Sequence, residues 1–138
     1  MEKAREGGCQ CGAIRYRIDG APLGLAVCHC TDCQNSTGSA YRVNVPAVKG
    51  TFKMTGGTVK QYLKTTAESG KPRVQGFCPE CGTPIYSSPD HGTENVGLRV
   101  GAIRQRAQLV PKVQQWMRSA QGWTQNLGGL EKAEKQRT

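Results

Sequence analysis

Cysteine is the residue type whose spacing in this chain most directly indicates chemistry. The seven cysteines lie in three groups along the 138 residues, spaced C-x-C, C-x-C-x₂-C and C-x₂-C. They are Cys9 and Cys11, then Cys28, Cys30 and Cys33, then Cys78 and Cys81. Thiols grouped at such short spacings are typical of zinc sites. The grouping therefore predicts bound metal.

The first and third groups together supply four thiols, the number that closes a structural zinc site. Two residues apart on a strand, Cys9 and Cys11 share a face and lie about 7 Å apart at the backbone, so their sulfurs can converge on one ion. Cys78 and Cys81 have the spacing of a zinc knuckle, and the following Gly82 suits such a turn because it tolerates a positive φ. We expect a tetrahedral four-cysteine zinc site that couples folding to metal binding.

The middle group has three thiols and no obvious fourth ligand. Cys28, Cys30 and Cys33 can hold a second zinc with one position open, the pattern of a reactive site. Three thiolates make this site soft and favour an external thiol as fourth ligand, so it suits sulfur chemistry better than hydrolysis. His29 is expected to point away from the metal. The open site should release its ion more easily than the closed one, so its occupancy can be partial.

Two other uses of the cysteines stay open at this point. One zinc ion can take Cys28, Cys30 and Cys33 together with a cysteine of another group, which would leave the other three cysteines without a metal. The Cys78-x₂-Cys81 pair also has the spacing of a redox motif, although no βαβ pattern surrounds it. The spacing indicates metal more strongly than it indicates how the cysteines are shared out.

Composition indicates a small domain with reduced thiols. The chain has the length of one domain, 36% hydrophobic residues and 18 glycines, which favours short strands and many turns. We find neither a signal peptide nor an apolar run long enough to span a membrane, so we expect a cytoplasmic protein. Thiols stay reduced there, and an odd number of cysteines fits poorly with a closed set of disulfides.

The elements that must position these thiols are mainly strands. Apolar and polar residues alternate over residues 14–18, 41–45 and 96–100, and a further strand is predicted at 58–65 after Gly56-Gly57. A short helix is predicted at 113–120 after Pro111. Trp116 and Trp123 are expected to cover one edge of the core. We expect an antiparallel β domain over residues 1–125 and a charged, flexible tail over 126–138.

The chain carries a large excess of positive charge. The formal net charge is +9, and residues 40–77 carry seven Lys or Arg against Glu68 alone. A solvated basic face, an anionic small substrate and a nucleic-acid surface all fit this excess. The basic residues are interspersed with apolar strand positions, and only 6% of residues are aromatic, which makes nucleic acid the weaker reading.

Three motifs that contain every cysteine resemble one known family. They are GGCQCGAIRY at residues 7–16, CHCTDCQ at 28–34 followed by TGS at 37–39, and FCPECGTPIY at 77–86. Their sequences, order and separations are similar to those of the glutathione-dependent formaldehyde-activating (GFA) family, which also includes centromere protein V. The resemblance spans roughly residues 7–123.

The resemblance implies a β-tent fold, a structural zinc on Cys9, Cys11, Cys78 and Cys81, and a catalytic zinc on Cys28, Cys30 and Cys33. It also implies a carbon–sulfur lyase of the S-(hydroxymethyl)glutathione synthase type, with glutathione or a similar thiol and a small aldehyde as partners. Arg42 is a candidate for attracting a carboxylate of such a thiol. The alternatives are a thiol carrier without turnover and a zinc-stabilised, non-catalytic binding module with a basic surface.

Overall fold

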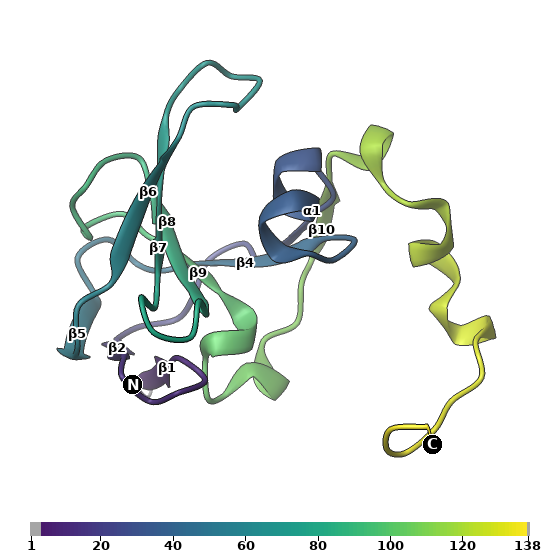
Figure 1. The fold of residues 1–138 in the computed structure, drawn as a ribbon, viewed down its shortest axis with the longest axis horizontal. Helices are drawn as coiled ribbons and strands as arrows, with labels where there is room; N and C mark the ends of the chain where they lie inside the picture. Colours follow the sequence, from purple (N-terminus) through teal and green to yellow (C-terminus); the bar gives the residue numbers. More distant parts are fainter. Residues whose placement is uncertain (1–3, 138) are drawn as a thin grey trace.

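Two β-sheets form the body of the protein (Figure 1). The computed structural model describes residues 4–137, which contain ten strands. The smaller sheet is antiparallel with the order β1–β2–β5, and its strands are β1 (Arg5–Gly8), β2 (Arg15–Ile18) and β5 (Phe52–Gly56).

The larger sheet has seven strands in the order β10–β3–β4–β9–β8–β7–β6. They are β10 (Val113–Gln115), β3 (Ala26–Cys28), β4 (Arg42–Pro46), β9 (Gly97–Arg99), β8 (Pro84–Ser88), β7 (Arg73–Phe77) and β6 (Lys60–Lys64). Every neighbouring pair is antiparallel except β10 and β3, which run parallel. The prediction of a mainly β protein with little helix is confirmed, with this one parallel pair as an addition.

The predicted strands follow from alternating polarity. In β2 the two arginines are exposed while Tyr16 and Ile18 are buried, as the alternation indicated. The strands predicted around residues 41–45, 58–65 and 96–100 are found as β4, β6 and β9.

An aromatic stack joins the two sheets in the core. The ring of Phe52 on β5 lies 5.2 Å from that of Tyr16 on β2 and 5.5 Å from that of Tyr86 on β8, measured between centroids. Ile85 and Leu98 from the larger sheet are fully buried in the same cluster. Packing between the sheets therefore depends on side chains from strands that are distant in sequence.

A short α-helix that sequence reasoning missed follows β3. Helix α1 (Thr31–Thr37) begins after Cys30, whose side chain caps it, and ends at Gly38 in the left-handed conformation. Its residues are polar apart from Cys33, so the sequence has no apolar periodicity from which this helix could be predicted. No helix in residues 4–137 is long and apolar enough to cross a membrane.

The helix predicted at 113–120 is wrong. Residues 113–115 form β10 because β3 offers them an open edge, and Met117–Ser119 form only a 3₁₀ turn. Trp116 between them adopts φ 60°, a left-handed conformation that is unusual for a residue with a side chain.

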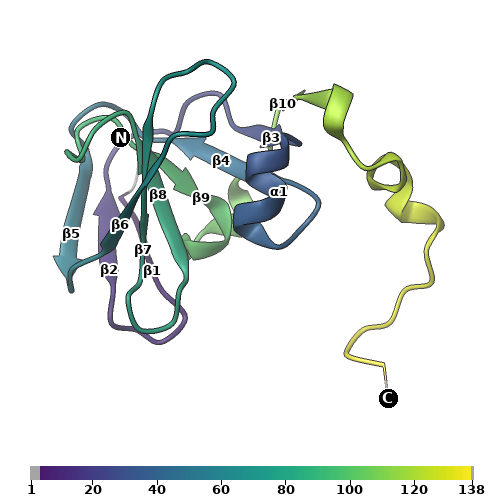
Figure 2. The same ribbon diagram turned by 45° about the horizontal axis from the view of Figure 1, so that its top comes forward.

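The two tryptophans do not cover the core as expected. Trp116 is 41% exposed and Trp123 is 58% exposed. Two 3₁₀ turns across Gly122–Gly129 follow, and the segment after β10, coloured green to yellow, extends away from the body of the protein (Figures 1 and 2). Hydrogen bonds between Gln125 and Gln114 still join it to β10. The division of the chain at residue 125 stays a prediction.

Candidate metal centres

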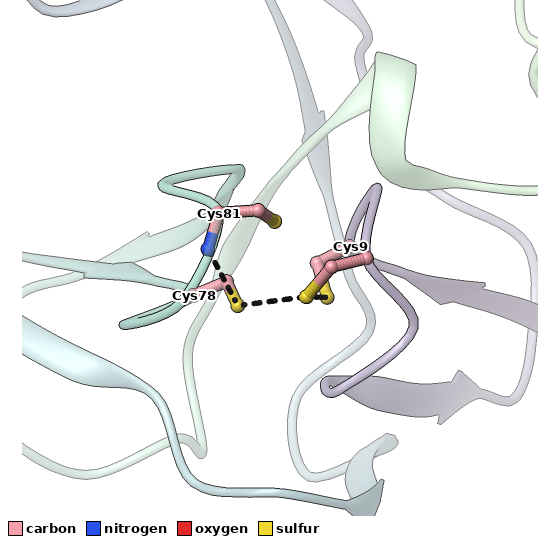
Figure 3. A group of neighbouring side chains, drawn as sticks. Cys9, Cys78 and Cys81 are labelled. Carbon is pink, nitrogen blue, oxygen red and sulfur yellow. Dashed lines mark hydrogen bonds between the residues drawn. The ribbon is translucent and has the colours of Figure 1, made fainter.

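Four cysteines from two turns gather at one end of the molecule. Cys9 and Cys11 lie in the turn between β1 and β2, and Cys78 and Cys81 lie in the turn between β7 and β8. Figure 3 shows the sulfurs of Cys78 and Cys81 facing that of Cys9 across the gap between the turns. All four sulfurs lie within 4.8 Å of one another. This four-cysteine cluster connects the smaller sheet to the larger one.

The spacing of these sulfurs fits a tetrahedral ion. Sγ of Cys11 lies 3.6 Å from Sγ of Cys9 and 3.7 Å from Sγ of Cys78. Four ligands at the usual Zn–S distance of about 2.3 Å would place neighbouring sulfurs about 3.8 Å apart. Four thiols are also the usual donor set of a closed zinc site. The cluster therefore has both the chemistry and the size for zinc.

Hydrogen bonds prepare these sulfurs to carry negative charge. The backbone N–H of Ile14 donates to Sγ of Cys9 at 3.1 Å, and the backbone N–H of Glu80 donates to Sγ of Cys78 at 3.4 Å. The side chain and backbone of Thr83 lower the pKa of Cys81 to about 5. Such N–H donors to sulfur stabilise thiolates.

The pKa of Cys11 is shifted in the opposite direction to that of Cys81. The backbone N–H of Ala13 favours its thiolate, but the hydrogen bonds with Cys9, Cys81 and Cys78 outweigh this and raise its pKa to about 12. Without a metal, the cluster therefore contains thiol and thiolate side by side. A bound cation would replace the remaining protons.

The other three cysteines gather where β3 passes into α1. Cys28 ends β3, Cys30 caps α1, and Cys33 lies in the first turn of α1. Their sulfurs also lie within 4.8 Å of one another, and Sγ of Cys30 accepts from the backbone N–H of Cys33 at 3.2 Å. The hydrogen bond between Cys28 and Cys33 lowers the pKa of Cys28 to about 5 and raises that of Cys33. In residues 4–137 no fourth Cys, His, Asp or Glu joins this three-cysteine cluster.

His29 lies on the other side of the backbone. Its ring is buried against Tyr41, and its Nε2 lies 2.9 Å from Oε1 of Gln114. It is not among the donors gathered around either cluster within the described range.

A pocket of about 270 Å³ opens beside the three-cysteine cluster, and its lining is basic. Arg42 of β4, Arg99 of β9 and Arg73 of β7 all line it, together with Trp116 at the end of β10. Sequence reasoning singled out Arg42 but missed Arg73 and Arg99, and it expected Trp116 at an edge of the core. Arg42 pairs directly with Cys28 in the sheet register, so its position was readable from local strand pairing. The other two depend on the order of strands across the sheet.

Comparison with known proteins agrees with this architecture. A family model described as "Glutathione-dependent formaldehyde-activating enzyme" matches residues 4–119, and the chain belongs to this family. No curated protein matches the chain. The crystal structure of a Rhodobacter sphaeroides protein superposes with a TM-score of 0.55 at 18% sequence identity, covering 77% of this chain and 97% of that one. This likeness shows a shared fold.

Proposed function

We propose that the protein is a zinc-dependent carbon–sulfur lyase of the glutathione-dependent formaldehyde-activating type. Zinc at Cys9, Cys11, Cys78 and Cys81 is structural, and a second zinc at Cys28, Cys30 and Cys33 serves the reaction. The observation that carries the proposal is the three-cysteine cluster. Among the described residues it gathers three thiols without a fourth ligand, and it lines a pocket that a substrate could enter. Family membership supports the same reading.

The proposed reaction joins a thiol to a small aldehyde. The sulfur attacks the carbonyl carbon, a C–S bond forms, and the π pair of the C=O bond moves to oxygen. The proton that the thiol loses ends on that oxygen, so the product is an S-hydroxyalkyl thiol and the reverse reaction is the lyase. Zinc bound at the cluster would keep the incoming thiol in its thiolate form, the form that attacks carbonyls.

The chain's own residues would bind and orient the reactants. Cys28, Cys30 and Cys33 would hold the ion, and the N–H bond from Cys33 to Sγ of Cys30 fixes one of these sulfurs. Asn44 and Gln115 add neutral polar groups to the pocket wall. Trp116, whose backbone has the left-handed φ of 60°, lines the same pocket.

Elemental analysis of reduced protein purified without chelators tests the metal part. We expect two zinc ions per chain in the wild type and one in Cys30→Ser, with an unchanged circular dichroism spectrum. One zinc in both proteins would contradict a second site.

Exchange spectroscopy by NMR on glutathione and formaldehyde tests the reaction. The wild type should accelerate formation and breakdown of the adduct, and Cys30→Ser should not. A wild type that binds thiol without accelerating exchange would be a carrier and would contradict the enzymatic role.

A further inference from the structure

Three arginines converge on the pocket of the three-cysteine cluster from neighbouring strands. In the sheet register Cys28 pairs with Arg42 and Asn44 pairs with Arg99, which places these four residues on one face. Gln75 pairs with Ser87 on the same side of the pocket, and Arg73 lies two residues before Gln75. The three guanidinium groups and the three sulfurs therefore share one small cavity.

These arginines have neutral hydrogen-bond partners only. Arg42 donates to the hydroxyl of Ser36, Arg73 donates to Oγ of Ser87 at 3.2 Å, and Arg99 donates to Oδ1 of Asn44 at 3.1 Å. Among residues 4–137, no carboxylate forms an ion pair with any of the three. Lys64 in the same pocket differs, because Oδ2 of Asp32 lies 3.4 Å from its Nζ.

The arginines are also partly removed from water. Arg42 is only 8% exposed, and its Nε is buried without a hydrogen-bond partner in the described structure. Burial, followed by the charge of Arg42, lowers the pKa of Arg99 to about 9. Buried cations of like charge that outnumber the negative charges beside them are costly, and a buried donor without an acceptor adds to that cost. An anion in the pocket would relieve both.

The charge of the site indicates which anion. Zinc with three thiolates carries a net charge of about −1, which leaves an excess of about +2 beside three arginines. A thiolate ligand cancels one of these charges, and a single carboxylate cancels the other. A phosphate group would bring nearly two negative charges and leave the site negative. Guanidinium forks also match the two oxygens of a carboxylate.

We propose that Arg42, Arg73 and Arg99 form an anion subsite that selects ligands carrying a carboxylate only a few bonds from the reacting sulfur or carbonyl. This inference rests on the proposed function for the sulfur and carbonyl chemistry, but the anion subsite itself rests on the arginines. Arg73 on β7 and Arg99 on β9 are the specificity-determining binding residues. They line the pocket from strands that lie beyond β4, whereas the cysteines line it from β3 and α1. The pocket's size of about 270 Å³ keeps the two ends of the ligand close together.

The test compares small thiols of different charge on the full-length, cobalt-substituted protein. Mercaptoacetate is anionic, 2-mercaptoethanol is neutral and cysteamine is cationic, and each is titrated while the cobalt–thiolate absorption is followed. The wild type should bind mercaptoacetate at least about tenfold more tightly than 2-mercaptoethanol, the range that charge-assisted hydrogen bonds give. Cysteamine should bind most weakly.

Variants separate recognition of the anion from folding and metal loading. Arg73→Gln and Arg99→Gln should each reduce the preference for mercaptoacetate over 2-mercaptoethanol about tenfold. Arg17→Gln is the matched control, because Arg17 is an exposed arginine outside this pocket and should leave the preference intact. An unchanged preference in both pocket variants, or equal affinity for the three thiols together with no effect of acetate on the arginine resonances, would overturn the proposal.

Acetate separates this inference from the proposed function. If no thiol alters the cobalt spectrum, the proposed thiol chemistry fails, and acetate binding then decides the anion subsite alone. Acetate titrated into ¹⁵N-labelled protein should shift the Nε–Hε resonances of the pocket arginines, and the shifts should disappear in Arg99→Gln. Unshifted arginine resonances would overturn the subsite. A carboxylate on the aldehyde instead of the thiol would give the acetate shifts without a preference for mercaptoacetate, and would contradict the thiol arm.

Discussion

Individual cysteines differ in how readily they give up their protons. Cys81 and Cys28 have pKa values lowered to about 5, whereas the pKa of Cys11 is raised to about 12 and that of Cys33 is raised as well. At neutral pH each metal-free cluster therefore holds at least one thiolate and one thiol. Only the thiolate binds zinc, so binding must displace the protons of Cys11 and Cys33.

Zinc affinity should consequently rise with pH in both clusters. Each proton released on binding makes the apparent affinity about tenfold greater per pH unit, as long as the group stays protonated in the metal-free protein. Competition with a chelator at pH 6, 7 and 8, corrected for the chelator's own protonation, measures this slope. An affinity that stays constant over this range would contradict the proton assignments.

At the scale of elements, two antiparallel strand pairs each place a glycine opposite a tyrosine. Gly7 of β1 pairs with Tyr16 of β2, and Gly76 of β7 pairs with Tyr86 of β8. A Cβ atom on Gly76 would lie 2.6 Å from Cζ of Tyr86, and one on Gly7 would lie 2.3 Å from Cζ of Tyr16. Both tyrosines are buried, so neither ring has free space to move into. These glycines let the two aromatic rings lie flat over the strands in the core.

Gly76→Ala should therefore destabilise the fold. Overpacking against the buried Tyr86 ring is expected to lower the free energy of unfolding by about 1–3 kcal/mol. Urea unfolding followed by circular dichroism measures the change. Gly101→Ala is the matched control, because a Cβ at Gly101 meets nothing within 4 Å. A loss of stability of equal size in both variants would show that the tyrosine contact is not the cause.

Some secondary-structure elements could be predicted from the sequence and others could not. Strands such as β2 were predictable because one face meets the core and the other meets solvent. Helix α1 was not, because its boundaries come from the Cys30 cap and Gly38 and only Cys33 is buried along it. Residues 113–115 were assigned to a helix because the edge of β3, which makes them a strand, is distant in sequence.

The residues of the candidate site also divide into those that local sequence could predict and those that it could not. The grouping of the cysteines is local, and the structure gathers the same two sets that spacing and family resemblance indicated. The arginine lining is not local, because Arg73 and Arg99 reach the pocket only through the strand order β4–β9–β8–β7. Alternation within one strand cannot predict that order.

At the scale of the whole molecule, the two cysteine clusters should contribute unequally to stability. The four-cysteine cluster joins a turn of the smaller sheet to a turn of the larger sheet, whereas the three-cysteine cluster lies within the β3–α1 segment. Loss of metal from the first should loosen the contact between the sheets. Loss from the second should leave that contact in place.

Thermal unfolding of Cys78→Ser and Cys30→Ser tests this difference. Cys78→Ser should lower Tm by about 10 °C or more, since several kcal/mol of metal-binding free energy is lost from a domain of this size. Cys30→Ser should change Tm by only a few degrees. Equal losses of Tm, or a larger loss in Cys30→Ser, would contradict the structural role of the four-cysteine cluster.

The four-cysteine cluster also sets an order of events during synthesis. Cys11 and Cys78 are separated by 67 positions, so the first pair of thiols leaves the ribosome about 3–13 s before its partners at typical rates of translation. During that interval the nascent chain carries Cys9 and Cys11 without the ligands that complete the site. The smaller sheet cannot be clamped to the larger one until the turn after β7 has emerged. With zinc bound as proposed, supply of the metal to the growing chain and protection of its first two thiols from oxidation would therefore matter during translation as well as in the folded protein.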